Sequence, residues 1–335
     1  MMSNPVAVVT GGAGFIGSHM VDLLLDEGYN VRVIDNFSGG HERNLAHHAG
    51  NPRLAIERAD ILTLEPQASV FKDAACLFHF AGIGDIVPSI ERPTDYLNTN
   101  VQGTVRVLEG ARAGGIGKVV YAASSSCYGL AATPTGEDHP IAPQYPYALS
   151  KYQGEQCVLH WHQVYRLPVN SIRIFNAYGP RVRTTGAYGA VFGVFLRQKL
   201  AAKPFTVVGD GTQKRDFVYV TDVARAFFLA SQTPLAGRIW NLGTGNPQSV
   251  LRLVELLGGP VTHVPRRPGE PDATWADIGA ITRDLGWAPR VSFEEGVGHM
   301  LDDIEVWRDA PLWDPDSIKT ATKTWFDFLG TEKTA

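Results

Sequence analysis

The chain has 335 residues, 44% of them hydrophobic and 19% charged, which is ordinary for a folded protein and long enough for one large core or two smaller ones. Its formal net charge is −4 and no lysine and arginine cluster occurs, so we expect neither nucleic acid nor a membrane as a partner. Cys76, Cys127 and Cys157 are too few and too scattered for a disulfide framework or a metal site. Without a leader-like start or an apolar run of about 18 residues, the sequence predicts a cytoplasmic protein.

The first elements predict one βαβ unit. Val6–Thr10 is short, β-branched and followed at once by glycines, as in a buried strand that leads into a loop. Apolar residues then keep helical spacing over Ile16–Leu24, and Gly28 ends that pattern. Val31–Asp35 follows as a second buried strand that ends in an acidic residue. A strand, a helix and a parallel strand are therefore expected in this order.

The same alternation continues along the chain. Strand-like and helical segments follow one another, namely the strands Leu54–Arg58, Cys76–Phe80, Val119–Ala122 and Val169–Ile174 and the helices Val101–Ala113 and Ala148–Tyr165. This rhythm predicts an α/β protein with a doubly wound, parallel Rossmann sheet. Because it loosens near residue 175, we expect a dinucleotide-binding domain over 1–175 and a smaller, substrate-binding lobe over 176–335.

Three further features are interpreted as structural. His19 and His79 fall in buried helix and strand patterns, so we expect them to pack and not to act as acids or bases. The segment Asp314–Leu329, rich in aromatic residues near its end, predicts a terminal helix docked on the body of the protein.

The glycines after the first strand predict a phosphate loop. Gly11–Gly17 fits G-x-G-x-x-G from Gly12 and G-x-x-G-x-x-G from Gly11, and both readings let the backbone approach a pyrophosphate at a helix N-terminus. A mere tight turn is the alternative. Asp35 at the end of the next strand favours the dinucleotide, since its carboxylate can accept both ribose hydroxyls. Asp35 would repel a 2′-phosphate, and Asn36 follows it instead of an arginine, so NAD is favoured over NADP.

A tyrosine and a lysine lie one helical turn apart and predict a catalytic pair. Tyr147 and Lys151 share one face of a helix that begins after Pro146. A phenol loses its proton near pH 10, so Lys⁺ and a cationic nicotinamide are the charges needed to make it a base near neutrality. The hydroxyls of Ser124–Ser126 follow a parallel strand at its carboxyl end, where such sheets bind ligands. A solvated surface pair is the alternative for this tyrosine and lysine taken alone.

The sequence resembles the extended short-chain dehydrogenase/reductase family, in particular its nucleotide-sugar epimerases such as UDP-glucose 4-epimerase. The resemblance covers nearly the whole chain and rests on the glycine loop and on Asp60-Ile61, His79–Gly82, Asn100–Thr104, Ser124–Gly129, Tyr147/Lys151, Arg173–Arg181, Gly209–Gly211, Arg215–Phe217 and Arg267–Glu270. It implies an enzyme that binds NAD and a nucleotide sugar, with Ser124, Tyr147 and Lys151 as the catalytic residues.

The resemblance also assigns the binding residues. It implies cofactor contacts from Gly11, Gly14, Phe15, Ile16, Gly17, Asp35, Asn36, Asp60, Ile61, Ala81, Asn100, Tyr147 and Lys151, with Asp60 and Ile61 beside the adenine. It implies substrate contacts from Ser124, Ser125, Ser126, Asn176, Arg215, Arg267, Glu270 and Thr274. Arginine suits the diphosphate because its guanidinium is planar and permanently charged, although each arginine taken alone could be a solvated surface residue. Glu270 stands where many members of the family have aspartate, so it should keep the ribose contact in a pocket of different dimensions.

The expected chemistry is epimerisation. Dehydratases of the family place an Asp-Glu pair after the catalytic Ser/Thr, where this chain has Ser125 and Ser126, and hydroxyls cannot do that acid–base work. The resemblance therefore favours reversible oxidation at C4 of UDP-glucose or UDP-galactose through a 4-keto sugar. Another sugar, such as a UDP-uronate or CDP-sugar, or another carbon is the alternative, and a silent NAD sensor belongs to a different class. Family members pair through the two helices predicted above, so a homodimer that buries Val158, Leu159 and Trp161 is expected.

Two features bear on the width of the pocket. Thr274 aligns with the position where a tyrosine restricts some 4-epimerases to unmodified hexoses, and Gly186–Val191 looks like a stretch of epimerases that prefer UDP-N-acetylhexosamines. Asn176 differs from the threonine usual in uronate epimerases. N-acetylated sugars are therefore expected to enter as well, unless Thr274 merely packs a turn.

Overall fold

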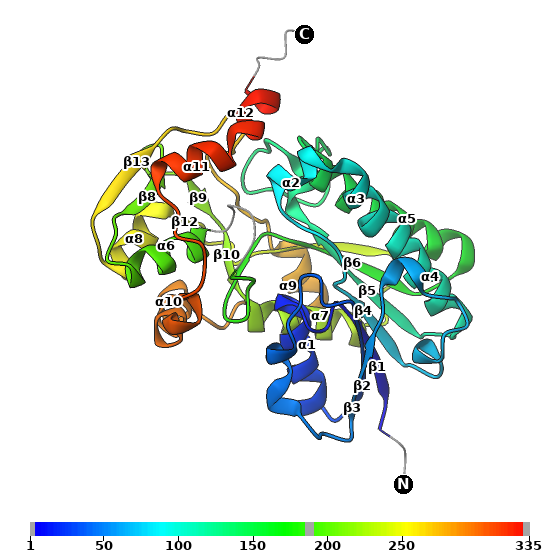
Figure 1. Ribbon diagram of the computed structural model, residues 1–335. Coiled ribbons are helices and arrows are strands. Elements are labelled where there is room, and N and C mark those ends of the chain that lie inside the picture. Colours follow the sequence, from blue (N-terminus) through cyan, green and yellow to red (C-terminus); the bar gives the residue numbers. More distant parts are fainter. Residues whose placement is uncertain (1–3, 185–190, 331–335) are drawn as a thin grey trace.

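The computed structural model describes residues 4–184 and 191–330 (Figure 1). Most of the segment Gly186–Val191, which the sequence associates with N-acetylhexosamine epimerases, lies outside the described residues. The N-terminal part forms a sheet covered by helices, and the later part forms a second lobe beside the sheet's upper edge in the view of Figure 1.

The main sheet has seven parallel strands in the order β11-β6-β5-β4-β1-β2-β3. Their bounds are β1 Val6–Thr10, β2 Asn30–Asp35, β3 Leu54–Arg58, β4 Cys76–His79, β5 Lys118–Ser124, β6 Val169–Ile174 and β11 Arg238–Leu242. The strand order turns back beside β1, between β1 and β4, and this switch point is where doubly wound sheets bind their ligands. The predicted fold class is thereby confirmed.

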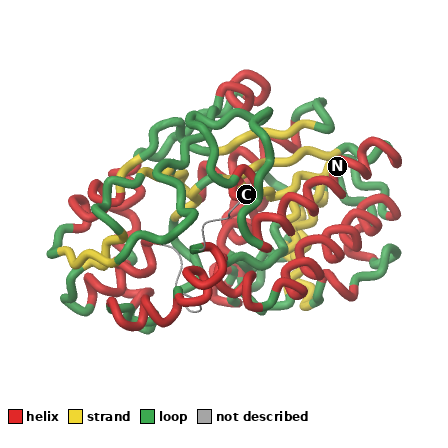
Figure 2. The backbone as a smooth tube through the Cα atoms, turned by 90° about the horizontal axis from the view of Figure 1, so that it is seen from above, coloured by secondary structure: helices red, strands yellow, loops and turns green. Residues whose placement is uncertain are grey.

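Helices cover both faces of this sheet (Figures 1 and 2). Successive side chains of β1 point to opposite faces of the sheet, so Ala7 and Val9 belong to the core on one face and Val8 belongs to the core on the other. The first core includes residues of α1 Phe15–Asp26, α7 Val220–Gln232 and α9 Gly279–Leu285. The second core packs under α4 Gly103–Ala113 and α5 Pro146–Tyr165, next to which lie α2 Ile86–Glu91 and α3 Pro93–Leu97.

The second lobe is built from short pairs of strands and has an aromatic core of its own. The strands are β7 Asn176–Tyr178 with β10 Phe217–Tyr219, β8 Phe205–Val208 with β13 Val261–Val264, and β9 Lys214–Arg215 with β12 Gln248–Ser249. The helices are α6 Val191–Leu200, α8 Val250–Leu257 and α10 Phe293–Asp302. In this core Tyr178 stacks on Phe192, Phe217 stacks on Phe293, and the two pairs meet edge to face.

The structure refines two predictions. The sheet crosses the expected boundary at residue 175, since β11, α7 and α9 come from the later part of the chain and complete the first lobe. The predicted terminal helix is two helices, α11 Pro315–Ala321 and α12 Lys323–Leu329, separated at Thr322. Among residues 4–184 and 191–330, no helix is long and apolar enough to span a membrane.

Candidate functional site

The glycine loop between β1 and α1 leaves no room for side chains at two positions. Gly11 has a φ of +69°, and a Cβ placed there would lie 2.7 Å from the backbone nitrogen of Ala81. A Cβ on Gly17 would collide with the carbonyl oxygen of Gly11. Gly14 is the N-cap residue of α1. Because glycine has no side chain, it does not cap the first backbone N–H groups of that helix. The amides therefore stay available for an anion, and the loop fits the pyrophosphate of NAD.

The two residues that follow the glycines begin α1. Phe15 makes an edge contact with His19, and the ring centroids are 6.3 Å apart. Ile16 packs against the first core, so its side chain faces the sheet. Phe15 and Ile16 thus reach a dinucleotide only through their backbone or partly exposed atoms.

Acidic residues follow β2 and β3 at the carboxyl edge of the sheet. The Asp35 carboxylate accepts hydrogen bonds from the amides of Ala13, at 2.9 Å, and Phe37, at 2.8 Å, and thereby fixes the loop. Asn36 donates to Asp60 at 2.9 Å, so these two predicted residues are brought together. Ile61 is buried against α4, where a Cβ on Gly103 would clash with it. These positions agree with an adenosine-binding edge, and their individual contacts stay predictions.

The predicted nicotinamide side gathers around Asn100. Its side chain is buried, accepts from the amide of Ile83 at 2.9 Å and donates to Ser150 Oγ at 2.9 Å. A Cβ on Gly82, the residue after Ala81, would lie 2.8 Å from Asn100 Oδ1 and 3.9 Å from Lys151 Nζ. Asn100 therefore braces the backbone beside Lys151, and its amide is already engaged.

The three predicted catalytic residues come together at the ends of β5 and α5. Burial raises the pKa of the Tyr147 phenol, and Ser124, the last residue of β5, lies close enough to lower that pKa in part by hydrogen bonding. Burial also lowers the pKa of the Lys151 ammonium to about 8, and this ammonium lies 4.5 Å from the centroid of the Tyr121 ring. The phenol's pKa stays above 10, so it still requires the cationic charges that the sequence analysis invoked.

The other two serines complete the polar edge. Ser126 Oγ lies 2.8 Å from Ser124 Oγ. Burial raises the pKa of the Tyr145 phenol, and Ser126 is also close enough to that phenol to lower its pKa in part. Ser125 begins the short turn after β5 and is partly exposed. Ser126 therefore links the catalytic serine to Tyr145.

His79 and His19 are structural, as predicted. His79 is 1% exposed, and its two ring nitrogens lie 2.7 Å from Thr10 Oγ1 and 3.0 Å from Thr104 Oγ1. His19 Nε2 lies 3.2 Å from the Pro180 carbonyl oxygen. Burial lowers the pKa of His79 to about 3 and that of His19 to about 4, so both rings are neutral near pH 7.

The predicted diphosphate residues form one ionic cluster in the second lobe. Glu270 forms ion pairs with both arginines. Its Oε1 atom lies 2.7 Å from a terminal guanidinium nitrogen of Arg215, and its Oε2 atom lies 2.9 Å from Nε of Arg267. All three side chains are largely buried, and burial lowers the pKa of Arg215. The cluster carries one net positive charge, which suits a diphosphate. It also rules out the alternative that Arg215 and Arg267 are solvated surface residues.

Asn176 and Thr274 form a second pair close to that cluster. Thr274 Oγ1 donates to Asn176 Oδ1 at 2.7 Å, although the two residues are 98 positions apart. The amide of Thr274 donates to the Lys214 carbonyl, which holds the loop beside β9. Thr274 thus adjoins a predicted substrate residue and also packs a turn, so both interpretations of its role stay open.

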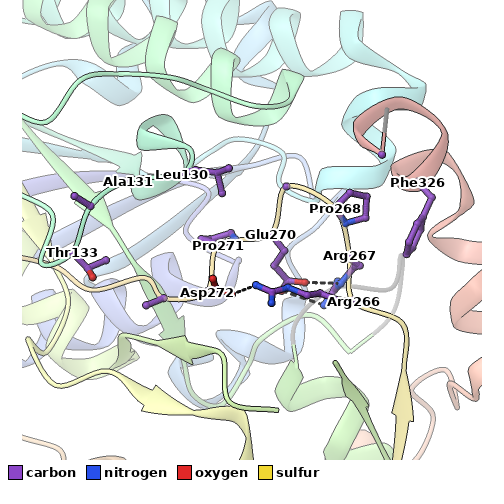
Figure 3. A pocket seen from close by; sticks show the side chains of 14 residues that line it. Leu130, Ala131, Thr133, Arg266, Arg267, Pro268, Glu270, Pro271, Asp272 and Phe326 are labelled. Carbon is purple, nitrogen blue, oxygen red and sulfur yellow. Dashed lines mark hydrogen bonds and ion pairs between the residues drawn. The ribbon is translucent and has the colours of Figure 1, made fainter. Parts of the chain in front are cut away.

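A cavity of about 1000 Å³ lies beside the ionic cluster (Figure 3). Its walls are residues of the Leu130–Thr133 and Arg266–Ala273 loops together with Phe326 and Gly330. Tyr145 connects this end to the catalytic end, because its ring stacks on that of Tyr147 with centroids 6.4 Å apart. Sequence analysis missed Tyr145, although its place two residues before Tyr147 was a signal, and it missed Phe326.

A separate cluster joins Asp22 of α1 to His47 and His48, which lie on the short helix Ala46–His48 outside the lining of this cavity. The Nε2 atoms of His47 and His48 lie 2.8 and 2.7 Å from Asp22 Oδ1, and these three ligand atoms could hold a metal ion. Arg181 forms an ion pair with the other oxygen of Asp22 at 2.7 Å. Because the guanidinium already neutralises the carboxylate, the cluster is poorly suited to a divalent cation.

Comparison with known proteins identifies the family of this chain. The model of the NAD dependent epimerase/dehydratase family matches residues 7–243. The UDP-glucose 4-epimerase of Mycolicibacterium smegmatis is 35% identical over 309 residues, covering 88% of this chain and 97% of that protein.

Two solved structures extend the comparison. UDP-N-acetylglucosamine 4-epimerase from Methanobrevibacter ruminantium, in complex with UDP-N-acetylmuramic acid, matches with a TM-score of 0.84 at 30% identity over 90% of this chain and 100% of that one. UDP-glucuronic acid 4-epimerase from Bacillus cereus, in complex with UDP-glucuronic acid and NAD, matches with a TM-score of 0.84 at 31% identity over 90% and 99%. The chain therefore belongs to the NAD dependent epimerase/dehydratase family, as a nucleotide-sugar isomerase with NAD as its cofactor.

Proposed function

We propose that this enzyme interconverts UDP-glucose and UDP-galactose by epimerisation at C4 through a transient 4-keto sugar. The observation that supports the proposal is that the site has a catalytic end and a positively charged end. Ser124 lies at one end, where it partly offsets the burial that raises the pKa of the Tyr147 phenol, and the Arg215–Glu270–Arg267 cluster lies at the other, with Tyr145 between them. A nucleotide sugar has a neutral reacting ring and a charged diphosphate, which match these two ends.

Each catalytic side chain has a proposed role. Tyr147 takes the proton of the sugar hydroxyl, Ser124 orients that hydroxyl, and Lys151 supplies positive charge that favours the phenolate. When bound, NAD supplies reversible hydride chemistry at the sugar carbon. The remote arginines keep hold of the diphosphate while the sugar, which makes weaker contacts, turns over between the two half-reactions.

The residues beside Ser124 favour epimerisation over a dehydratase reaction, in which water would be eliminated from the sugar. By the family resemblance, Ser125 and Ser126 occupy the positions that carry an Asp-Glu pair in dehydratases, and the Ser126 hydroxyl is hydrogen-bonded to that of Ser124. Neutral hydroxyls with these partners cannot act as an acid–base pair near pH 7. Epimerisation is therefore preferred to dehydration on the same scaffold.

UDP-N-acetylhexosamines are proposed as further substrates, since Thr274 is small and adjoins Asn176. The Methanobrevibacter relative acts on such a sugar, and the Bacillus cereus relative binds a uronic acid, so a UDP-uronate is the second candidate. The Asp85 carboxylate favours the neutral sugars because it lies close enough to Tyr147 to raise the pKa of the phenol electrostatically. A like charge on a uronate would be repelled there unless Arg183, which pairs with Asp85, neutralises it.

The later lobe is proposed to close on the nucleotide sugar, and two copies of the chain are proposed to pair through α4 and α5. The side chain of Val158 cannot contribute to that interface as predicted, because it is buried in the chain's own core. Val164 and Tyr165 at the end of α5 are 52% and 46% exposed and are better candidates. Light scattering at low micromolar concentration tests the dimer, and a monomer alone would overturn it.

The reaction is tested with a panel of UDP-, CDP-, GDP- and dTDP-sugars, with epimers resolved by NMR. We expect UDP-glucose and UDP-galactose to approach the same equilibrium mixture from either side. NAD released from the denatured enzyme should account for the cofactor, because both half-reactions use the same molecule. A requirement for continuous NADH supply would show a net reductase, and bound NAD without turnover of any sugar would revive the sensor alternative.

A further inference from the structure

The C-terminal helix α12 lies against both lobes at the mouth of the cavity. Figure 1 places α12 next to α2, and Thr324 Oγ1 donates to Glu91 Oε1 of α2 at 3.0 Å. On its other side, Trp325 Nε1 donates to the Pro268 carbonyl oxygen at 2.7 Å. Phe326, the next residue, lines the cavity together with Arg267 and Pro268 (Figure 3). The helix is therefore a wall of the cavity as well as the end of the fold.

Trp325 touches both the ionic cluster and the catalytic helix. The indole is 6% exposed, and the guanidinium carbon of Arg267 lies 5.3 Å from its ring centroid. The same indole lies 6.3 Å from the ring of Tyr145, the N-cap residue of α5. Tyr145 in turn stacks on Tyr147. One side chain thus joins the predicted diphosphate anchor to the helix that carries the catalytic phenol.

The contact between Arg267 and Trp325 matters for anion binding because it does not use the same part of the guanidinium as an anion does. Glu270 now holds Arg267 through the edge of the guanidinium, which is also the edge that a diphosphate needs. A cation–π contact with a ring does not use the N–H donors of a guanidinium, which lie in the guanidinium plane. Because the contact with Trp325 does not depend on Glu270, we expect it to remain when a diphosphate competes with Glu270 for that edge.

We propose that Trp325 is a positioning residue that holds Arg267 in place for the diphosphate of the nucleotide sugar, with α12 as the outer wall of that subsite. The inference rests on the proposed function, because it takes a nucleoside diphosphate as the ligand. It predicts that changes at Trp325 act on nucleotide affinity and KM and leave kcat and the NAD content nearly unchanged.

The test compares W325F with W325L in the full-length enzyme, by isothermal titration with UDP. Both substitutes are apolar, but only phenylalanine offers a ring face to Arg267. We expect W325L to weaken UDP binding about tenfold and W325F to stay within about threefold of the wild-type Kd. KM for the UDP-sugar should rise in parallel with Kd. F328A on the same helix, where the side chain is 68% exposed, is the control for perturbation of α12.

Titration separates affinity from folding, because a misfolded fraction lowers the binding stoichiometry without changing the Kd of the folded remainder. Equal Kd values for W325F and W325L would overturn the positioning role, and so would a loss in F328A as large as that in W325L. A wild-type enzyme that binds NAD but has no measurable affinity for UDP would instead overturn the proposed substrate. If W325L does not fold, a wild-type Kd in W325H, which keeps an aromatic ring, supports the proposal, and a tenfold weaker one contradicts it.

Discussion

The cofactor half of the site and the substrate half are fixed by different interactions. In the cofactor half, Gly11 and Gly17 act through the backbone, the Asp35 carboxylate binds backbone amides, and all three lie within one βαβ unit. In the substrate half, side chains meet across long stretches of chain, since Arg215 and Glu270 are 55 positions apart and Asn176 and Thr274 are 98 apart. The first half is therefore rigid by local geometry, and the second depends on how the lobe packs.

This difference predicts which property a substitution in each half should change. Backbone turns and tight packing set the cofactor half, so changes there should affect folding and NAD retention. Replaceable polar contacts set the substrate half, so changes there should affect KM and selectivity. The catalytic phenol lies where the two halves meet, and its loss should affect neither kind of binding.

The largest effect is expected for Tyr147→Phe. The variant keeps the ring that stacks on Tyr145 but lacks the hydroxyl whose pKa burial raises and Ser124 lowers in part. We expect kcat to fall at least about 10²-fold with NAD still bound, because the proton acceptor is missing. Tyr165→Phe, at the exposed end of the same helix, is the control and should keep full activity. Near wild-type turnover of Tyr147→Phe would move the base to the serines.

Arg215→Gln should weaken substrate binding and leave cofactor binding unchanged. Arg215 is one of two guanidinium groups on Glu270, and its loss leaves a cluster without net positive charge. Hydrogen bonds to a charged group contribute about 1.5–3 kcal/mol, so we expect KM for the UDP-sugar to rise about 10- to 100-fold with NAD content unchanged. Steady-state kinetics with Arg308→Gln, an exposed arginine, as control would measure this. A loss in kcat with no rise in KM would place Arg215 nearer to the chemistry.

Acid should destabilise the cofactor half first. The folded-state pKa of His19 is about 4 and that of His79 about 3, both below the ordinary value of 6.5, because burial penalises the charged ring. Between about pH 4 and 6.5 the unfolded chain therefore binds more protons, so the free energy of unfolding falls as pH falls. Each histidine contributes a slope of up to about 1.4 kcal/mol per pH unit.

The variant His19→Gln tests this sign. An amide can still donate to the Pro180 carbonyl but does not titrate. Urea unfolding at pH 6.5 and pH 4.5 should show a smaller loss of stability on acidification than in the wild type. His160→Gln, at an exposed position of α5, should leave that loss unchanged. An unchanged loss in His19→Gln would assign the acid sensitivity to other groups.

Sequence patterns predicted the first half better than the second for a physical reason. The strand Leu54–Arg58 and the strand Val169–Ile174 have the predicted bounds, since short apolar runs between turn residues are local signals. The boundary at residue 175 did not follow the sheet, because β11 joins β6 through tertiary pairing that no local pattern reports.

The candidate site shows the same limit. The spacing of Tyr147 and Lys151 is visible on one helix, whereas the contact of Trp325 with Arg267 joins residues from separate elements. The resemblance supplied Arg215 and Glu270, but their mutual ion pair and the role of Tyr145 between the two ends required the packed lobe. Long-range side-chain convergence is what single-sequence reasoning lacks.

The smallest expected effect concerns Thr274, whose two interpretations remain separable. Thr274→Tyr adds a ring beside Asn176 and also removes the hydroxyl that donates to it, whereas Thr274→Val removes only the hydroxyl at nearly constant volume. Dividing the two variants' kcat/KM values therefore isolates the added bulk. A steric gate predicts that the Tyr variant loses about three- to tenfold more than the Val variant on UDP-N-acetylglucosamine and no more on UDP-glucose. Equal losses on both sugars would mean that Thr274 only packs the loop beside β9, and the breadth of the pocket would then be set by other residues.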